Sequence, residues 1–149
     1  MVVSPIQLAL KRGVFMNSIR FVPTAVHAVF DYVGGIGLIA SPFIFRFASM
    51  GGIPVILPIV LGSGLILYSL LTNYELGIPG LRVVPMSVHL TIDFVASALL
   101  AAAPFLFGYS DQGLNVWLPQ VIAGLGVIAL VLVTKTEPQF GAKVMKVAV

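Results

Sequence analysis

The chain has no cysteine, and it carries few charged residues for its length of 149 residues. The absence of cysteine excludes disulfide bonds, thiolate catalysis, iron–sulfur clusters and cysteine-based zinc sites. Asp, Glu, Lys and Arg make up 9% of the sequence, against about 25% in a typical soluble domain. Because so few charged groups cannot cover the surface of a globule of this size, we expect lipid to surround most of the chain.

The sequence also lacks a basic stripe, although its net charge is +3. Lys and Arg are scattered among the tails and the expected loops, so the charge does not indicate a nucleic-acid partner. Apolar residues are abundant instead: they make up 59% of the chain, and the mean hydropathy is +1.10. The lipid bilayer is therefore the first partner that the composition predicts.

Four apolar stretches are long enough to cross a bilayer, which takes about 20 helical residues. We place them at 24–46, 54–73, 86–108 and 115–134. Lipid offers the backbone no hydrogen-bond partners, so these stretches should be helices. The sequence predicts an all-α integral membrane protein with four transmembrane helices.

Prolines and aromatic residues mark the ends of these stretches. Pro23 and Pro85 stand in the expected first turns, where a missing N–H costs little. Pro42 and Pro104 fall near the far ends of the first and third stretches, where they should end or kink the helix. Aromatic residues near these ends predict anchors at the membrane interface: Phe43, Phe45 and Phe47, then Phe105, Phe107 and Tyr109, and Trp117 in the fourth stretch.

One pattern occurs twice in the chain, 62 residues apart. When residues 23–75 are aligned with residues 85–137, 17 of 53 positions are identical. Such self-similarity indicates an internal repeat. Because each copy contains two expected helices, the sequence predicts two tandem, parallel helical-hairpin repeats. We divide the chain into an N-terminal cytoplasmic or interfacial segment, two repeats and a C-terminal tail: 1–22, 23–79, 80–141 and 142–149.

The basic residues predict the orientation of the helices. With four spans, seven of these residues lie on one side of the membrane: Lys11, Arg12, Arg20, Arg82, Lys135, Lys143 and Lys146. Arg46 lies on the other side, near Asp111. By the positive-inside rule, both termini are expected in the cytoplasm.

The first 22 residues do not resemble a secretory signal peptide, because the apolar stretch before Lys11 is short and no small-residue cleavage site follows it. Residues 14–22 mix apolar side chains with Arg20, which predicts a segment lying at the membrane interface. The sequence leaves open whether translation starts at Met1 or Met16.

Each repeat carries one His–Asp pair within apolar sequence: His27 with Asp31, and His89 with Asp93. Residues four apart share a helix face. At 1.5 Å per residue, each His lies about 6 Å and each Asp about 12 Å beyond the proline that begins its helix. Ionisable residues in a membrane face the bundle interior and find partners. Further polar candidates lie at the cytoplasmic ends of the second and fourth helices: Thr72, Glu75, Thr134 and Glu137.

Three interpretations of these pairs are open. In the first, which we favour, each Asp accepts a hydrogen bond from a His within its helix or across the repeat interface, and the pairs fix the helix register without a ligand. In the second, the pairs and the cytoplasmic-end residues relay protons or ions. In the third, the two His bind haem, the four side chains hold a metal, or a His binds a quinone. We predict no catalytic residue, no metal and no cofactor.

Glycine motifs in the expected helices have a simpler explanation than ligand binding. Residues 35–40 match the dinucleotide-binding pattern G-x-G-x-x-A, but no strand precedes them. Small residues at this place predict close helix packing instead. Gly62 with Gly64, and Gly124 with Gly126, predict the same.

The order Pro-x-x-Val-His-x-x-x-Asp, an apolar run, Ser41-Pro42-Phe43 and then residues 68–77 resembles the SPW-repeat family of small prokaryotic membrane proteins. The resemblance spans about residues 20–138. The family is named for a Ser-Pro-Trp triplet in each repeat, and this chain has Phe43 and Phe105 in place of the Trp. The resemblance implies a four-helix, two-repeat architecture in a bacterial or archaeal cytoplasmic membrane. It implies no activity.

We therefore expect a small, non-enzymatic, multi-pass membrane protein that acts as a structural or accessory subunit. It would self-associate or join a larger membrane complex, because short, glycine-rich helices invite further helix contacts. The alternatives are a proton- or ion-coupled carrier or channel that uses the two His–Asp pairs, and a haem- or quinone-binding membrane protein.

Overall fold

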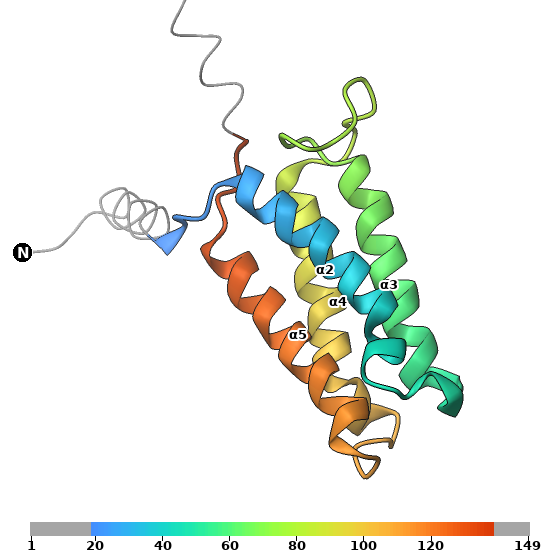
Figure 1. Cartoon of the computed structure of the whole chain (residues 1–149). Helices are drawn as coiled ribbons and strands as arrows, with labels where there is room; N and C mark the ends of the chain where they lie inside the picture. Colours follow the sequence, from blue (N-terminus) through green and yellow to red (C-terminus); the bar gives the residue numbers. More distant parts are fainter. Residues whose placement is uncertain (1–18, 139–149) are drawn as a thin grey trace, which may run out of the picture.

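Four helices, each long and apolar enough to cross a membrane, dominate residues 19–138, which the computed structural model describes. They are α2 (Thr24–Ile44), α3 (Gly52–Leu70), α4 (Met86–Leu106) and α5 (Leu114–Val133), with a short 3-10 helix, η1 (Ala48–Met50), before α3. Successive helices run in opposite directions (Figure 1). The prediction of an all-α protein with four spans is confirmed. Most of the expected N-terminal segment and the C-terminal tail lie outside the described residues.

The helices α2 and α4 end in the same kind of turn. Each ends two residues after its proline, Pro42 or Pro104, and so two residues before the end expected from the sequence. The next turn places Arg46 and Gly108 in the left-handed region, with φ of 60° and 69°. The N–H of the following residue then bonds back to the proline carbonyl, as in a Schellman motif.

This turn corrects the prediction that both aromatic runs anchor at the interface. Phe43 and Phe105 are about two-thirds exposed, as anchors would be, whereas Phe47 and Tyr109 are buried. The Schellman geometry folds the residue after the left-handed position back onto the helix, which explains their burial. Phe47 and Tyr109 pack in one apolar cluster, and the predicted anchor Trp117 lies half-buried against it.

Glycine lets the helices of each hairpin approach closely. α2 packs mainly against α3, and α4 mainly against α5. A Cβ atom added to Gly62 would lie 2.5 Å from the carbonyl oxygen of Gly35, and one added to Gly124 would lie 2.5 Å from that of Ser97. Neither contact is sterically acceptable, so the backbones meet only because these two positions are glycine.

Backbone pairing joins the extended segments to the helix ends near the start of α2 and α4. Val22, before α2, pairs with Thr134, after α5; Val84, before α4, pairs with Thr72, after α3. The two bridges are equivalent in the repeat, because Val22 and Val84 are 62 residues apart, and so are Thr72 and Thr134. The second bridge explains why α3 ends at Leu70 and not near residue 73: the Asn73 N–H donates to the Val84 carbonyl instead of continuing the helix.

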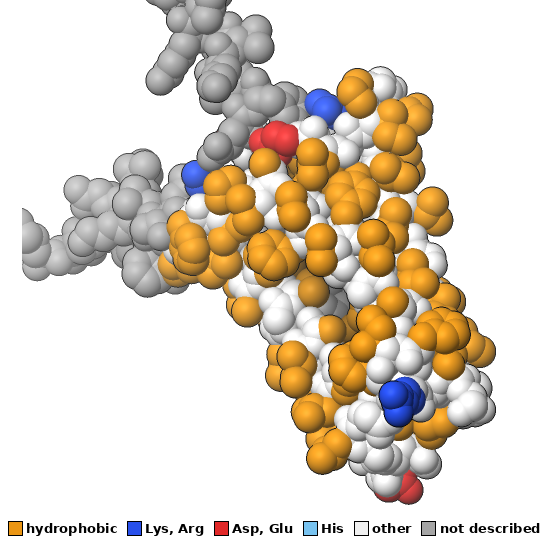
Figure 2. All heavy atoms as spheres, in the orientation of Figure 1, with side chains coloured by type: hydrophobic (Ala, Val, Ile, Leu, Met, Phe, Trp, Pro, Cys, Tyr) orange, Lys and Arg blue, Asp and Glu red, His pale blue; other side chains and the backbone are white. Residues whose placement is uncertain are grey.

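Apolar side chains cover the outer surface between the helix ends. Figure 2 shows charged side chains toward the two ends of one face, with hydrophobic side chains between them. Exposed apolar residues are found on all four helices, such as Val33, Ile56, Val95 and Ile122. A surface of this kind suits lipid and not water.

Candidate functional site

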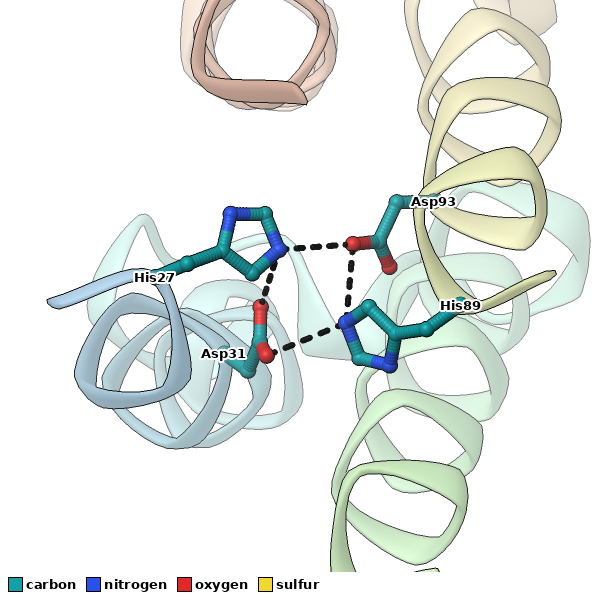
Figure 3. Close-up of side chains that lie close together, drawn as sticks. All are labelled: His27, Asp31, His89 and Asp93. Atoms are coloured by element: carbon teal, nitrogen blue, oxygen red, sulfur yellow. Dashed lines mark hydrogen bonds and ion pairs between the residues drawn. The ribbon is translucent and has the colours of Figure 1, made fainter. Parts of the chain in front are cut away.

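The two His–Asp pairs meet inside the bundle. His27 and Asp31 come from α2, and His89 and Asp93 come from α4 (Figure 3). Both histidines are 0% exposed, and the residues Asp31 and Asp93 are 4% and 3% exposed. We call these four side chains the His–Asp cluster.

Each His contacts the carboxylates of both helices. His27 Nε2 lies 3.0 Å from Asp93 Oδ2 on α4 and 3.3 Å from Asp31 Oδ1 on its own helix. His89 Nε2 lies 3.2 Å from Asp31 Oδ2 on α2 and 3.1 Å from Asp93 Oδ2 on its own helix. The contacts between the helices are as short as those within them, so the cluster joins the first hairpin to the second.

Two threonines hold the outer nitrogens of the imidazole rings. His27 Nδ1 lies 2.9 Å from Thr134 Oγ1, and His89 Nδ1 lies 2.8 Å from Thr72 Oγ1. Each threonine therefore contacts the His of the other repeat. Both threonines were predicted as polar candidates, and both are 0% exposed.

The threonine contacts determine which ring nitrogen carries a proton. Each threonine hydroxyl donates its single proton to the carbonyl four residues earlier, Tyr68 O at 2.7 Å or Leu130 O at 2.6 Å. The hydroxyl oxygen can then only accept from the imidazole, so Nδ1 carries a proton in both rings. The Nε2 atoms are left to face the carboxylates.

Two tyrosines bind the carboxylates from outside the cluster. The Tyr68 hydroxyl donates to Asp93 Oδ1, and the Tyr74 hydroxyl donates to Asp31 Oδ2 at 3.1 Å. Burial, together with the nearby Asp31 charge, raises the pKa of Tyr74 far above its ordinary value, so its phenol remains a donor. Neither tyrosine was predicted from the sequence. Tyr68 stands where the second repeat has Leu130, and Tyr74 where it has Thr136, so the repeat comparison gave no signal for them.

The remaining polar candidates do not join the cluster. Glu75 accepts hydrogen bonds from the Thr24 hydroxyl at 2.9 and 2.7 Å, near the start of α2. Glu137 is exposed. Of the four cytoplasmic-end residues, the structure brings only the two threonines to the His–Asp cluster.

A groove of about 990 Å³ runs between α2 and α5, and Asp31 forms part of its wall. We call it the α2–α5 groove. It extends from Phe45 and Leu114 at one end to Val133 at the other. Its lining is almost wholly apolar, so the carboxylate of Asp31 is the ionisable group that it touches among its described lining residues.

The groove follows from differences between the repeats. Small residues line it where the other repeat has larger ones. Gly34, Gly37, Ala123 and Ala129 line the groove, and the residues 62 positions away from them are Ala96, Leu99, Leu61 and Leu67. Within the described part of the chain, Gly37, Gly64 and Gly126 do not take part in close helix packing, because a Cβ added at any of these three would meet nothing within 4 Å.

The comparison with protein families decides where the chain belongs. The model of the SPW repeat domain matches residues 25–134. The chain belongs to the SPW repeat family. This SPW repeat protein is thus a multi-pass membrane protein, and the match covers the four helices except for the first residue of α2, together with the whole His–Asp cluster. Searches of curated proteins and of solved structures returned no match.

Proposed function

We propose that this SPW repeat protein is a non-enzymatic accessory protein of the prokaryotic cytoplasmic membrane that works as a homodimer, with the α2–α5 groove as its contact face. The observation that carries this proposal is the groove. Glycines that line it, such as Gly37 and Gly126, have empty space beside them and are not used in the close packing of their own hairpin. In the same proposal, the His–Asp cluster holds the two hairpins together, and both termini lie in the cytoplasm. Arg20, Arg82 and Lys135, near one end of the bundle, support that orientation.

A second copy of the chain suits the groove because large side chains project from the same face of the molecule. Phe30, Val33 and Ile122 belong to the groove wall, yet they are 56%, 64% and 61% exposed. A face with both a groove and large projecting side chains can pair with itself about a two-fold axis, as an isologous interface requires. The space beside Gly34 and Gly37, where an added Cβ would meet nothing within 4 Å, would allow close helix approach, which drives helix association in lipid.

The chain supplies its own matched variants for a test. Gly126 and Gly64 are equivalent positions, both with open space at Cβ, but only Gly126 lines the groove. Gly126→Leu and Gly37→Leu would fill the groove, the latter with the residue that the second repeat has at position 99. Gly64→Leu adds the same bulk elsewhere on the surface.

The measurement is the oligomeric state of the full chain in nanodiscs and by cross-linking in native membranes. We expect a dimer for the wild type and for Gly64→Leu, and a monomer for Gly126→Leu and Gly37→Leu. A monomeric wild type, or a dimer that persists in both groove variants, would contradict the proposal. Co-purification of a different membrane protein that depends on Gly126 would replace the second copy with that partner.

The second candidate function is proton- or ion-coupled transport, and one observation favours it. Asp31 belongs both to the buried cluster and to the wall of the groove, so the cluster touches an open cavity. In proteoliposomes, a pH-dependent ion flux that Asp31→Asn abolishes and Glu75→Gln preserves would support this candidate. Equal leakage from vesicles with wild-type and Asp31→Asn protein would remove it.

The haem hypothesis gains no such support among the described residues. The centroids of the two imidazole rings lie 5.5 Å apart, and the carboxylates of Asp31 and Asp93 stand between the Nε2 atoms. A porphyrin with two axial His ligands needs that space for its own ring.

A further inference from the structure

The His–Asp cluster brings together the donor atoms of a metal site. One ligand atom from each of its four residues lies within 4.8 Å of the other three. Asp93 Oδ2 lies 3.0 Å from His27 Nε2 and 3.1 Å from His89 Nε2. Asp31 approaches with both oxygens: Oδ2 lies 3.2 Å from His89 Nε2, and Oδ1 lies 3.3 Å from His27 Nε2. For a tetrahedral zinc ion with bonds of 2.0–2.1 Å, neighbouring ligand atoms lie about 3.3 Å apart. The N–O separations of the cluster are therefore close to those of such a site.

The proton positions argue that something positive lies between the Nε2 atoms and the carboxylates. With Nδ1 protonated in both rings by the threonine contacts, a neutral imidazole turns the lone pair of Nε2 inward. That lone pair would then face carboxylate oxygens at 3.0–3.3 Å, which is repulsive. Two protons or one divalent cation would remove the repulsion.

His89 favours the cation over the protons. Its Nε2 atom is fully buried and makes no hydrogen bond of acceptable geometry, although Asp31 Oδ2 and Asp93 Oδ2 lie only 3.2 and 3.1 Å away. A proton on this atom would point well at neither oxygen. A metal ion between the two oxygens needs no such alignment with either one.

The surroundings of the cluster are those of a metal site. Histidine ligands in metal sites donate their second N–H to a fixed acceptor, as both rings do here to Thr72 and Thr134. Tyr68 and Tyr74 likewise hold the carboxylates. Two carboxylates and one divalent cation sum to zero charge, which suits a site buried within a membrane-spanning bundle.

We propose that the His–Asp cluster binds one divalent metal ion through His27 Nε2, His89 Nε2 and the carboxylates of Asp31 and Asp93. Two imidazole nitrogens and two carboxylate oxygens in a four-coordinate arrangement suit Zn²⁺ best. This proposal is independent of the homodimer, since the groove variants leave all four ligands in place.

The test is metal binding by the purified full-length protein in nanodiscs. The protein is incubated with Zn²⁺ alone, freed of unbound ion by gel filtration and analysed for metal content. We expect about one zinc per chain for the wild type and for the control Glu75→Gln, whose carboxylate lies outside the cluster. We expect at least a tenfold loss of affinity in Asp31→Asn and His89→Gln, with helix content and elution volume checked for each variant.

A second readout does not depend on variants that fold. Co²⁺ bound by the wild type should show the intense visible absorption of a tetrahedral site, and Zn²⁺ should displace it. Thr72→Val keeps all four ligands and should weaken zinc binding about 10- to 100-fold by releasing the His89 ring. A wild type that retains less than a tenth of an ion per chain, or zinc binding unchanged in Asp31→Asn, would overturn the proposal.

Discussion

The contact between Thr134 and His27 gives the sharpest prediction about stability. Thr134→Val keeps the shape of the side chain and replaces its hydroxyl with a methyl group. The buried N–H of His27 then loses its acceptor at 2.9 Å, and the Leu130 carbonyl loses its donor at 2.6 Å. A buried polar group left without a partner costs about 1–3 kcal/mol. We expect Thr134→Val to lower the free energy of unfolding by that amount.

The matched control is Thr91→Val. The Thr91 hydroxyl also donates to the carbonyl four residues earlier, Ser87 O at 2.9 Å, but Thr91 is exposed and lies outside the His–Asp cluster. Its substitution should change the free energy of unfolding by less than about 0.5 kcal/mol.

Reversible unfolding in mixed micelles, followed by helix content, measures both variants. Thr134→Ser keeps the hydroxyl and should recover most of the loss. If the free energies of unfolding of Thr134→Val and Thr91→Val differ by less than about 0.5 kcal/mol, the contact between Thr134 and His27 does not stabilise the cluster. A serine variant as unstable as the valine variant would point instead to packing of the threonine methyl.

Three further outcomes follow from the structure. Gly124→Ala should cost about 1–3 kcal/mol of stability in the same unfolding assay through overpacking against α4, whereas Gly64→Ala should cost nothing measurable. Arg46→Gly, which gives α2 the residue found at position 108, should raise the free energy of unfolding by about 1 kcal/mol, because Arg46 has a left-handed backbone. In right-side-out vesicles of this cysteine-free chain, an impermeant maleimide should label Asp111→Cys and spare Glu137→Cys; the reverse pattern would invert the proposed orientation.

The sequence predicted the membrane architecture because its signals there are strong. In four long apolar stretches, lipid leaves the helix as the structure that satisfies the backbone hydrogen bonds, and the prolines place the helix ends to within a few residues. The errors came from turn geometry. Arg46 does not look like a residue of a Schellman motif, so the burial of Phe47 was not expected.

The cluster could be predicted only in part. A spacing of four places His27 and Asp31 on one helix face, and the repeat gives the second pair an equal depth. Tertiary packing decides the rest: the distances across the bundle, the contact of each threonine with the His of the other repeat, and the positions of the two tyrosines. The sequence of one helix carries no information about which hydroxyl of another helix will reach its imidazole.

The α2–α5 groove also escaped prediction, for a related reason. The repeat is recognised by the residues that its two copies share, whereas the groove is produced by positions at which the copies differ, such as Gly37 and Leu99. Glycines that pack inside the molecule, such as Gly62, and glycines open to its outside, such as Gly126, look alike in the sequence. Only the structure separates them.

The His–Asp cluster joins the two repeats because the threonine of each repeat contacts the His of the other. The chain contains only two histidines, so ¹⁵N-histidine NMR of the full protein in nanodiscs reports on the cluster alone. We expect a proton on Nδ1 of both rings. We also expect Thr134→Val to perturb the Nδ1 resonance of His27, and Thr72→Val to perturb that of His89. A ring with its only proton on Nε2, or perturbation of the His in the threonine's own repeat, would show that the threonines do not join the repeats in this way.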